Sequence, residues 1–191
     1  MTTDRMTTHP EKAYLEIILG GMYAGKTSRL IEIHKQYTFC NIPVCVINHS
    51  IDNRYDDDLM TTHDQQKVQC IKADSLFGAL DNYNEQIMGS DVILINEGQF
   101  FPDLINFVPF MLSKNKKIYV CGLDGDFKRK KFGQILDLIP LCDKVSKLTS
   151  LCSICKDGTP GIFSKRITDE LEQTVVGSTN YIPVCRKCYH K

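Results

Sequence analysis

Residues 20–27, with the sequence GGMYAGKT, constrain the fold of this chain more than any other stretch. They fit the pattern G-x-x-x-x-G-K-[ST] in full, follow an apolar run at residues 15–19 and precede a stretch with helical spacing. In such a loop, successive backbone N–H groups at a helix N-terminus form a cradle for phosphate, and the glycines keep side chains out of it. The alternative, a glycine turn that merely precedes a lysine, leaves the flanking strand and helix unexplained. The pattern therefore predicts a strand, a phosphate-binding loop and a helix, in that order.

Two residues of this loop have expected roles toward a nucleoside triphosphate and its Mg²⁺. Lys26 reaches the outer phosphates, and the Thr27 hydroxyl ligates the metal ion. The predicted phosphate contacts are Gly20, Gly21, Met22, Tyr23, Ala24, Gly25, Lys26 and Thr27. The loop predicts that a triphosphate binds, and it leaves open which group receives the phosphate.

Short apolar runs alternate with stretches of helical spacing as far as about residue 148. The runs lie at residues 15–19, 44–47, 92–95 and 118–121. Strands that alternate with helices form a parallel sheet covered on both faces, and binding sites lie at the carboxyl ends of such strands. We therefore expect an α/β fold with one edge lined by Gly20, Asn48, Asn96 and Gly122.

The apolar run at residues 92–95 is followed directly by Asn96 and Glu97. NTPases with this kind of loop hold the Mg²⁺ shell with an aspartate at the end of another strand, and Asn96 occupies that place. Glu97 is then a carboxylate close to the transferable phosphate, where it can accept the proton of an attacking hydroxyl. The alternative for Glu97 is a solvated charge in a loop. The presence of both loops favours the catalytic role.

Nine cysteines, four of them in two C-x-x-C pairs, point to metal ligation. Cys152 and Cys155 form one pair, Cys185 and Cys188 form the other, and 29 residues separate the pairs. In a reducing compartment, two such pairs supply four thiolates for a tetrahedral structural Zn²⁺. A redox role is the alternative for a single pair, and His190 is a weaker alternative ligand. We expect a Zn²⁺ site that clamps the segment between the pairs, as a hairpin or a long loop.

Charge balance and the N-terminal sequence exclude several classes of partner. With 23 Lys and Arg against 23 Asp and Glu, the formal net charge is +0, so no overall field holds the molecule to nucleic acid or to an anionic membrane. The polar start lacks the apolar segment of a signal peptide, and no apolar run approaches a membrane span, so we expect a cytoplasmic protein. The expected divisions are a polar extension at 1–14, an α/β domain at 15–148 and a zinc-binding domain at 149–191.

Several stretches, in the same order, resemble those of a known family, the zinc-containing type II thymidine kinases of cells and large DNA viruses. The resemblance runs from about residue 15 to residue 189. The stretches that carry it are GGMYAGKTSRL, DNRY, EGQFFPD, LDGDFKRKKFG, FSKR and both C-x-x-C pairs. It implies a P-loop NTPase-type parallel sheet flanked by helices, with a small C-terminal zinc-binding domain whose long loop, the lasso, covers the substrate.

The resemblance implies ATP-dependent phosphorylation of the thymidine 5′-hydroxyl, which gives dTMP and ADP. By motif, Glu97 corresponds to the family's catalytic base, and Asp52 and Arg54 of DNRY correspond to positions near the triphosphate and the metal ion. The positions that contact the nucleoside correspond to Met22, Phe100, Leu123, Phe127, Phe132, Ser164 and Tyr181. The implied cofactors are structural Zn²⁺ and Mg²⁺ with ATP. The implied assembly is a homo-oligomer, a dimer or tetramer, with dTTP as a feedback inhibitor.

Asn96 departs from the family pattern, which has DEGQ where this chain has NEGQ. An asparagine can hold a metal-bound water through its carbonyl, but it brings no charge. We therefore expect Thr27 and Asp52 to hold the magnesium ion, with Asn96 orienting its hydration shell. On sequence alone, an aspartate at position 96 is expected to lower the Mg²⁺ concentration that the protein needs.

Two other functions fit part of the sequence. A phosphate-loop NTPase with a zinc ribbon that acts on nucleic acid would show a basic surface and an ATPase activity stimulated by polynucleotide. A nucleotide-sensing regulator without catalysis would account for Asn96. Thymidine-dependent release of ADP distinguishes the three functions.

Overall fold

The structure, a computed structural model, describes residues 13–52, 59–61, 66–170, 172–175 and 180–190 of the 191-residue chain. At its centre is a six-stranded sheet in the order β5-β2-β6-β7-β1-β8, in which each strand pair is parallel. The strands are β1 (Tyr14–Gly20), β2 (Val44–His49), β5 (Ile71–Ala73), β6 (Val92–Asn96), β7 (Lys117–Gly122) and β8 (Lys144–Leu148). The α/β class predicted from the alternating runs is confirmed.

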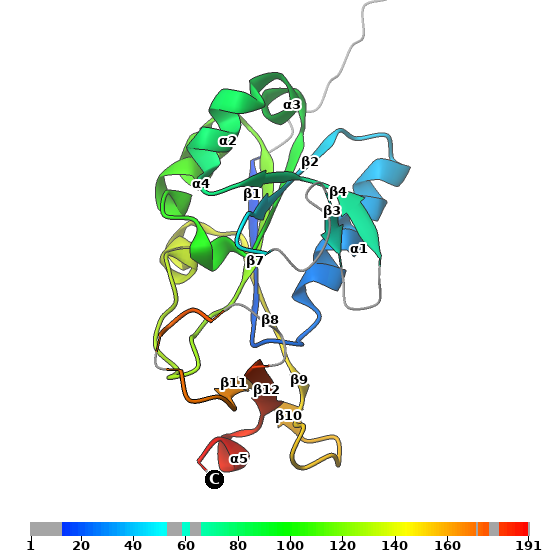
Figure 1. Cartoon of the computed structure of the whole chain (residues 1–191). Helices are drawn as coiled ribbons and strands as arrows, with labels where there is room; N and C mark the ends of the chain where they lie inside the picture. The colour runs from blue at the N-terminus through cyan, green and yellow to red at the C-terminus, as the bar shows by residue number, and fades with distance from the viewer. Residues whose placement is uncertain (1–12, 53–58, 62–65, 171, 176–179, 191) are drawn as a thin grey trace, which may run out of the picture.

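Both faces of this sheet are covered (Figure 1). One face carries α1 (Lys26–Phe39) and the hairpin of β3 (Leu59–Thr61) and β4 (Lys67–Gln69). The other carries α2 (Leu76–Asn82), α3 (Asn84–Gly89), α4 (Leu104–Ser113) and the 3₁₀ helix η2 (Ile135–Leu141). Successive side chains of β1 point to opposite faces of the sheet, so β1 contributes to both cores. Leu15 and Ile17 belong to the core shared with α4 and η2, whereas Ile18 belongs to the core shared with α1. A strand buried on both faces is mostly apolar, as the sequence showed, and the one buried charge of β1, Glu16, pairs with Lys144 of β8.

The four apolar runs are β1, β2, β6 and β7, as predicted, whereas β5 and β8 were missed. β5 has only three residues, and β8 is largely exposed at the sheet edge. Residues 48–62 are polar and lack apolar periodicity, which predicts a loop, but they contain the end of β2 and all of β3, so that prediction is wrong in part. Asn48 pairs with Asn96, and Leu19 pairs with Gly122, which aligns the strand ends along one edge as expected.

After β8 the chain leaves the main sheet and forms small antiparallel pairs. β9 (Ser150–Leu151) pairs with β10 (Pro160–Gly161), β11 (Phe163–Arg166) pairs with β12 (Tyr181–Val184), and α5 (Arg186–Tyr189) follows. The pair β11–β12 closes the base of the segment between the two cysteine pairs, so the clamped hairpin expected there is present. The core of this part is small, with Val184 among the four paired cysteines.

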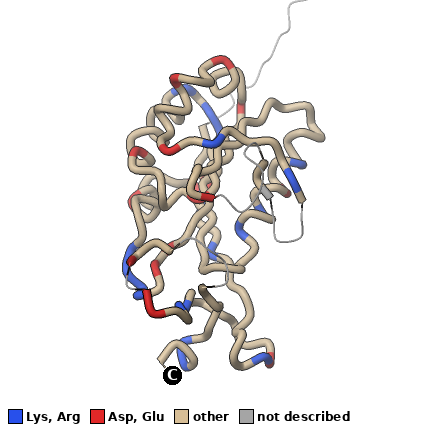
Figure 2. The backbone as a smooth tube through the Cα atoms, in the orientation of Figure 1, with Lys and Arg blue, Asp and Glu red and all other residues tan. Residues whose placement is uncertain are grey.

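Charged residues of both signs are interspersed along the chain, and Figure 2 shows neither sign confined to one part of the fold. This distribution agrees with the formal net charge of +0. Among the described helices, none combines the length and the apolar character that a bilayer crossing requires.

Candidate active site

The predicted phosphate loop connects β1 to α1 at the carboxyl edge of the sheet. Gly25 precedes the helix with a φ of 81°, in the left-handed region that favours glycine. The Lys26 ammonium donates to the backbone carbonyl of Gly21 at 2.8 Å, so its side chain lies back along the loop. This arrangement places backbone N–H groups at the N-terminus of a 14-residue helix, which is a favourable place for an anion.

Glu97 follows β6 with a left-handed backbone, at φ 55° and ψ 40°. This conformation is uncommon for a residue with a Cβ, and it turns the chain into the 3₁₀ helix η1 (Gly98–Phe100). The Gln99 side chain holds the site together, because its Nε2 donates to Glu97 Oε2 at 2.7 Å and its Oε1 accepts from the Leu123 backbone N–H at 3.0 Å. Gln99 is 3% exposed. Sequence reasoning gave it no role, although its place two residues after Glu97 was the available signal.

Gly133 lets the following loop approach Gln99 closely. Its φ is 60°, and a Cβ at this position would lie 1.9 Å from the Gln99 carbonyl oxygen. The loop from Gly122 to Gly133 is therefore fixed against η1 by backbone packing at one end and by the Leu123 hydrogen bond at the other. Both contacts orient the residues expected to line the nucleoside site.

The charged residues predicted for the site gather around the Cys121 thiol, near the end of β7. Burial is the main cause that raises the pKa of this thiol to about 12; the negative charges of Glu97 and Asp52 act in the same direction, and the Lys26 charge opposes them. Charges act on a group in this way only from nearby. Lys26, Glu97 and Asp52 come from three separate segments and all act on the Cys121 thiol, while their roles toward a phosphate and a metal ion stay predictions.

Asn96 lies at the centre of a buried hydrogen-bond chain. The Cys121 thiol donates to Asn96 Oδ1 at 2.9 Å, and Asn96 Nδ2 donates to Asn48 Oδ1 at 2.9 Å. Asn48 Nδ2 in turn lies 3.3 Å from Asp52 Oδ2, to which it donates. Asn96 is 1% exposed, so its contacts with the rest of the site run through protein groups. Arg54, the remaining predicted residue of this segment, lies outside the described residues.

The aromatic residues expected around the nucleoside fall into two groups. Phe100 of η1 packs edge to face on Phe132, with ring centroids 5.3 Å apart, and also contacts the His49 ring at 5.5 Å. Phe127 lies elsewhere in the same loop, where its ring faces the Arg166 guanidinium at 3.7 Å. Phe101 is 1% exposed and belongs to the main core.

The segment expected to form the lasso contacts the phosphate loop directly. The Ser164 hydroxyl on β11 accepts a hydrogen bond from the Met22 backbone N–H at 2.9 Å. A Cβ on Gly21 would lie 3.2 Å from the same hydroxyl oxygen, so the close approach depends on that glycine. Two predicted substrate residues from opposite ends of the chain, Met22 and Ser164, are therefore neighbours.

Arg166 organises the chain that follows β11. Its side chain is buried, with 8% of the residue exposed. The guanidinium donates to the Tyr181 hydroxyl and to the backbone carbonyls of Glu170 (2.8 Å), Glu172 (2.5 Å) and Gln173 (3.3 Å). This arginine lies within FSKR, a stretch that carries the family resemblance, but the sequence predicts no role for it, because the carbonyls that it binds carry no sequence signal.

Replacing Arg166 by methionine is expected to lower the free energy of unfolding by about 1–3 kcal/mol, since the hydroxyl of the buried Tyr181 and the three backbone carbonyls lose a charged donor. Urea unfolding measures the change, and protease digestion should show faster cleavage between residues 166 and 181. Arg186→Met is the matched control, because Arg186 is exposed and its guanidinium lies 5.1 Å from the Phe163 ring. Equal stability of the two variants would contradict the organising role.

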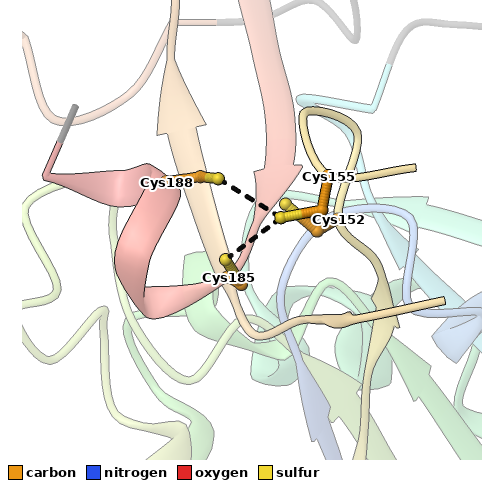
Figure 3. Close-up of side chains that lie close together, drawn as sticks. All are labelled: Cys152, Cys155, Cys185 and Cys188. Carbon is orange, nitrogen blue, oxygen red and sulfur yellow. Dashed lines mark hydrogen bonds between the residues drawn. The ribbon is translucent and has the colours of Figure 1, made fainter. Parts of the chain in front are cut away.

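The four cysteines of the two C-x-x-C motifs converge in the C-terminal part, and Figure 3 shows their side chains turned toward one another. Their ligand atoms all lie within 4.8 Å of one another, with Cys155 Sγ 3.8 Å from Cys185 Sγ and 3.5 Å from Cys188 Sγ. Tetrahedral Zn–S bonds of 2.3 Å place sulfurs about 3.8 Å apart, which matches these distances. These cysteines are therefore positioned to bind a metal ion. His190 does not join them, and its Nε2 lies 3.3 Å from an Arg129 guanidinium nitrogen.

Burial opposes ionisation of the Cys152 thiol, but hydrogen bonds from the backbone of Cys155, Cys185 and Ile154 outweigh burial and lower its pKa. A thiolate is the form that binds metal ions. The side-chain hydrogen bond with Cys188 is the main cause that raises the pKa of Cys155 to about 12, so the lowered pKa is a property of Cys152 and the spacing of the four sulfurs is what fits a closed site.

The metal cluster is connected to the loop that carries Phe127. The Tyr189 hydroxyl donates to the Phe127 backbone carbonyl at 2.7 Å, and the Arg129 guanidinium stacks on the Tyr189 ring at 4.3 Å. In addition, Gln173 Nε2 donates to Asp126 Oδ2 at 2.8 Å. The C-terminal part therefore holds the loop between β7 and η2 from two sides.

Comparison with known proteins identifies relatives that match this chain over most of its length. The family model described as thymidine kinase matches residues 13–189. The thymidine kinase of Yaba monkey tumor virus is 43% identical over 179 residues, covering 93% of this chain and 95% of the relative. The thymidine kinase of sheeppox virus is 42% identical over 92% of this chain and 96% of the relative. Thymidine kinase 1 of Dictyostelium discoideum is 36% identical over 92% of this chain and 77% of the relative. With the expected motifs at one edge of the sheet, these matches show that the chain belongs to the thymidine kinase family.

Proposed function

We propose that this protein transfers the γ-phosphoryl group of ATP to the 5′-hydroxyl of thymidine, giving dTMP and ADP. The observation that carries the proposal is the hydrogen bond between Ser164 and Met22, at 2.9 Å. It joins the segment expected to cover a nucleoside to the loop expected to hold a triphosphate. A nucleoside bound under that segment has its hydroxyl beside the phosphate loop, which is the arrangement that phosphoryl transfer needs.

In this proposal Glu97 accepts the proton from the 5′-hydroxyl as that oxygen attacks phosphorus. Gln99 holds the carboxylate in place through its 2.7 Å hydrogen bond. Phosphoryl transfer depends on orientation and charge stabilisation more than on base strength, so a fixed carboxylate suits the task.

The triphosphate lies on the backbone of Gly20, Gly21, Met22, Tyr23, Ala24 and Gly25, with Lys26, Thr27 and Arg54 as further contacts. When bound with ATP, Mg²⁺ would supply positive charge that offsets the negative charge developing on the transferred phosphoryl group. Thr27 and Asp52 hold the ion in this proposal, and Asn96 supports them from within the sheet. Thr27 and Asp52 offer the hydroxyl and carboxylate oxygens that Mg²⁺ prefers, so the residues present fit the ion.

The nucleoside contacts in this proposal are the seven residues of the family positions. They are Met22, Phe100, Leu123, Phe127, Phe132, Ser164 and Tyr181. The ion at Cys152, Cys155, Cys185 and Cys188 is a structural Zn²⁺, because a closed four-thiolate site leaves no open position for substrate. Free thiols in such a cluster suit a reducing compartment such as the cytoplasm. Inhibition by dTTP and assembly into a dimer or tetramer stay predictions of the family resemblance.

The deciding experiment measures ADP release from ATP and Mg²⁺ with and without thymidine. Thymidine and deoxyuridine should support turnover, whereas deoxyadenosine and deoxyguanosine should not, because a pocket that hydrogen-bonds a pyrimidine edge leaves polar groups unpaired with a purine. Mass spectrometry should identify dTMP as the product. ATP hydrolysis that polynucleotide stimulates and thymidine leaves unchanged would overturn the proposal in favour of a nucleic-acid enzyme.

A further inference from the structure

The hydrogen-bond chain from Cys121 to Asp52 has only one polarity that satisfies all of its members. Asp52 presents a carboxylate oxygen, which only accepts, so Asn48 must turn its Nδ2 toward it. Asn48 Oδ1 then faces Asn96, which must donate through its own Nδ2. Asn96 Oδ1 is left to face Cys121, whose thiol supplies the proton. The charge of Asp52 therefore fixes the orientation of two buried amides in succession.

Burial makes this polarity matter. Asn48 is 0% exposed and Asn96 is 1% exposed, so water does not replace a contact that either amide loses. A reversed amide would leave two acceptors facing each other inside the protein, which is unfavourable. The series of hydrogen bonds begins at Cys121 on β7 and continues to β2 through Asn96 and Asn48, which occupy paired positions of neighbouring strands.

We propose that Asn96 is a positioning residue, which fixes the Asp52 carboxylate through Asn48 rather than contacting the metal ion itself. This inference rests on the proposed function, in which Asp52 serves Mg²⁺. It assigns roles to Asn48 and Cys121, which the sequence motifs leave without one. It also explains how a neutral residue can occupy a place where the family has a carboxylate: the neutral amide donates to Asn48, and Asn48 can then donate to Asp52.

The consequence is opposite to the expectation from sequence alone. An aspartate at position 96 has no N–H to offer Asn48 Oδ1, so Asn48 must reverse and present Nδ2 to the new carboxylate. Its Oδ1 then faces Asp52, and the hydrogen bond that Asn48 donates to the Asp52 carboxylate is lost. The added charge also lies close to Glu97 and Asp52, which disfavours a third carboxylate there. A lysine at position 48 would remedy both faults, because one ammonium group can donate to both carboxylates.

The test measures Mg²⁺-dependent binding of a non-hydrolysable ATP analogue by calorimetry, so that it does not depend on turnover. Asn96→Asp and Asn48→Ala should each raise the half-saturating Mg²⁺ concentration about ten-fold or more, as expected for a lost hydrogen bond to a charged group. Thymidine binding, measured in the same way, should stay within a few-fold of the unchanged protein. The double variant Asn48→Lys with Asn96→Asp should recover most of the loss.

Asn106→Asp is the matched control, because it adds the same charge on the exposed side of α4 and should leave the Mg²⁺ requirement unchanged. An Asn96→Asp protein with an equal or lower Mg²⁺ requirement would overturn the inference. So would an Asn48→Ala protein that binds as the unchanged protein does, and this arm decides the matter should Asn96→Asp fail to fold in urea titrations. A double variant no better than Asn96→Asp would refute the polarity argument. Failure of the proposed function is distinguishable, because it shows as a lack of thymidine-dependent ADP release in the unchanged protein.

Discussion

Glu97→Gln is expected to lower turnover by about 10²- to 10⁴-fold, the usual contribution of a general base, with substrate binding nearly unchanged. Glutamine has the shape of glutamate but cannot take up a proton from the attacking hydroxyl. Its side-chain carbonyl can still accept the hydrogen bond that Gln99 donates to Glu97 at 2.7 Å, so the local geometry should persist. Steady-state kinetics at saturating Mg²⁺ should therefore show a lower kcat with little change in KM for ATP or thymidine.

A matched control for this variant is Glu32→Gln on α1. Glu32 is exposed and pairs with Arg29 at 2.6 Å on the helix surface, where an ion pair contributes little. Turnover of this control should equal that of the unchanged protein. If Glu97→Gln retained turnover close to that level, the proton would have another acceptor and the assignment of Glu97 would be wrong.

The parallel sheet was predictable because its central strands are buried on both faces and are therefore mostly apolar, with Glu16 of β1 as an exception. β8 shows the limit of that rule. It lies at the sheet edge with Val145 43% exposed, so its sequence KVSKL carries no continuous apolar run. α2 shows a second limit, since its first N–H groups, on Leu76 and Phe77, donate to the Asp103 carboxylate from a distant segment. A cap of this kind has no local sequence pattern.

Groups that could bind a ligand were recognisable from the sequence where their members lie close together in it. The phosphate loop and the C-x-x-C pairs are local patterns, because backbone geometry fixes how near their members must be. The roles of Gln99, Asn48, Cys121 and Arg166 were missed for the opposite reason. Each acts on a group brought to it by the fold, as Gln99 does on Leu123, and backbone carbonyls bound by Arg166 exist in every sequence.

Loss of the metal ion should strongly reduce the order of the C-terminal part and the binding of thymidine, and Cys185→Ser tests this. The four sulfurs come from two segments separated by 29 residues, and the core between them contains little apolar material beyond Val184. Structural zinc sites contribute an apparent binding free energy of about 10–16 kcal/mol, far more than so small a core supplies. Mass spectrometry should count one zinc ion per chain in the unchanged protein. We expect the variant to bind no zinc and to lose order after residue 149.

Thymidine binding should fall with the metal, whereas binding of the ATP analogue should remain. The reason is that the C-terminal part holds the nucleoside residues through the Tyr189 contact with Phe127 and the Ser164 contact with Met22. The phosphate loop is instead built on β1 and α1, which the main sheet holds. Cys40→Ser is the control, because Cys40 is an exposed thiol at the end of α1 and should change neither affinity. A metal-free protein that binds and phosphorylates thymidine fully would show that the four cysteines do not hold the substrate site together.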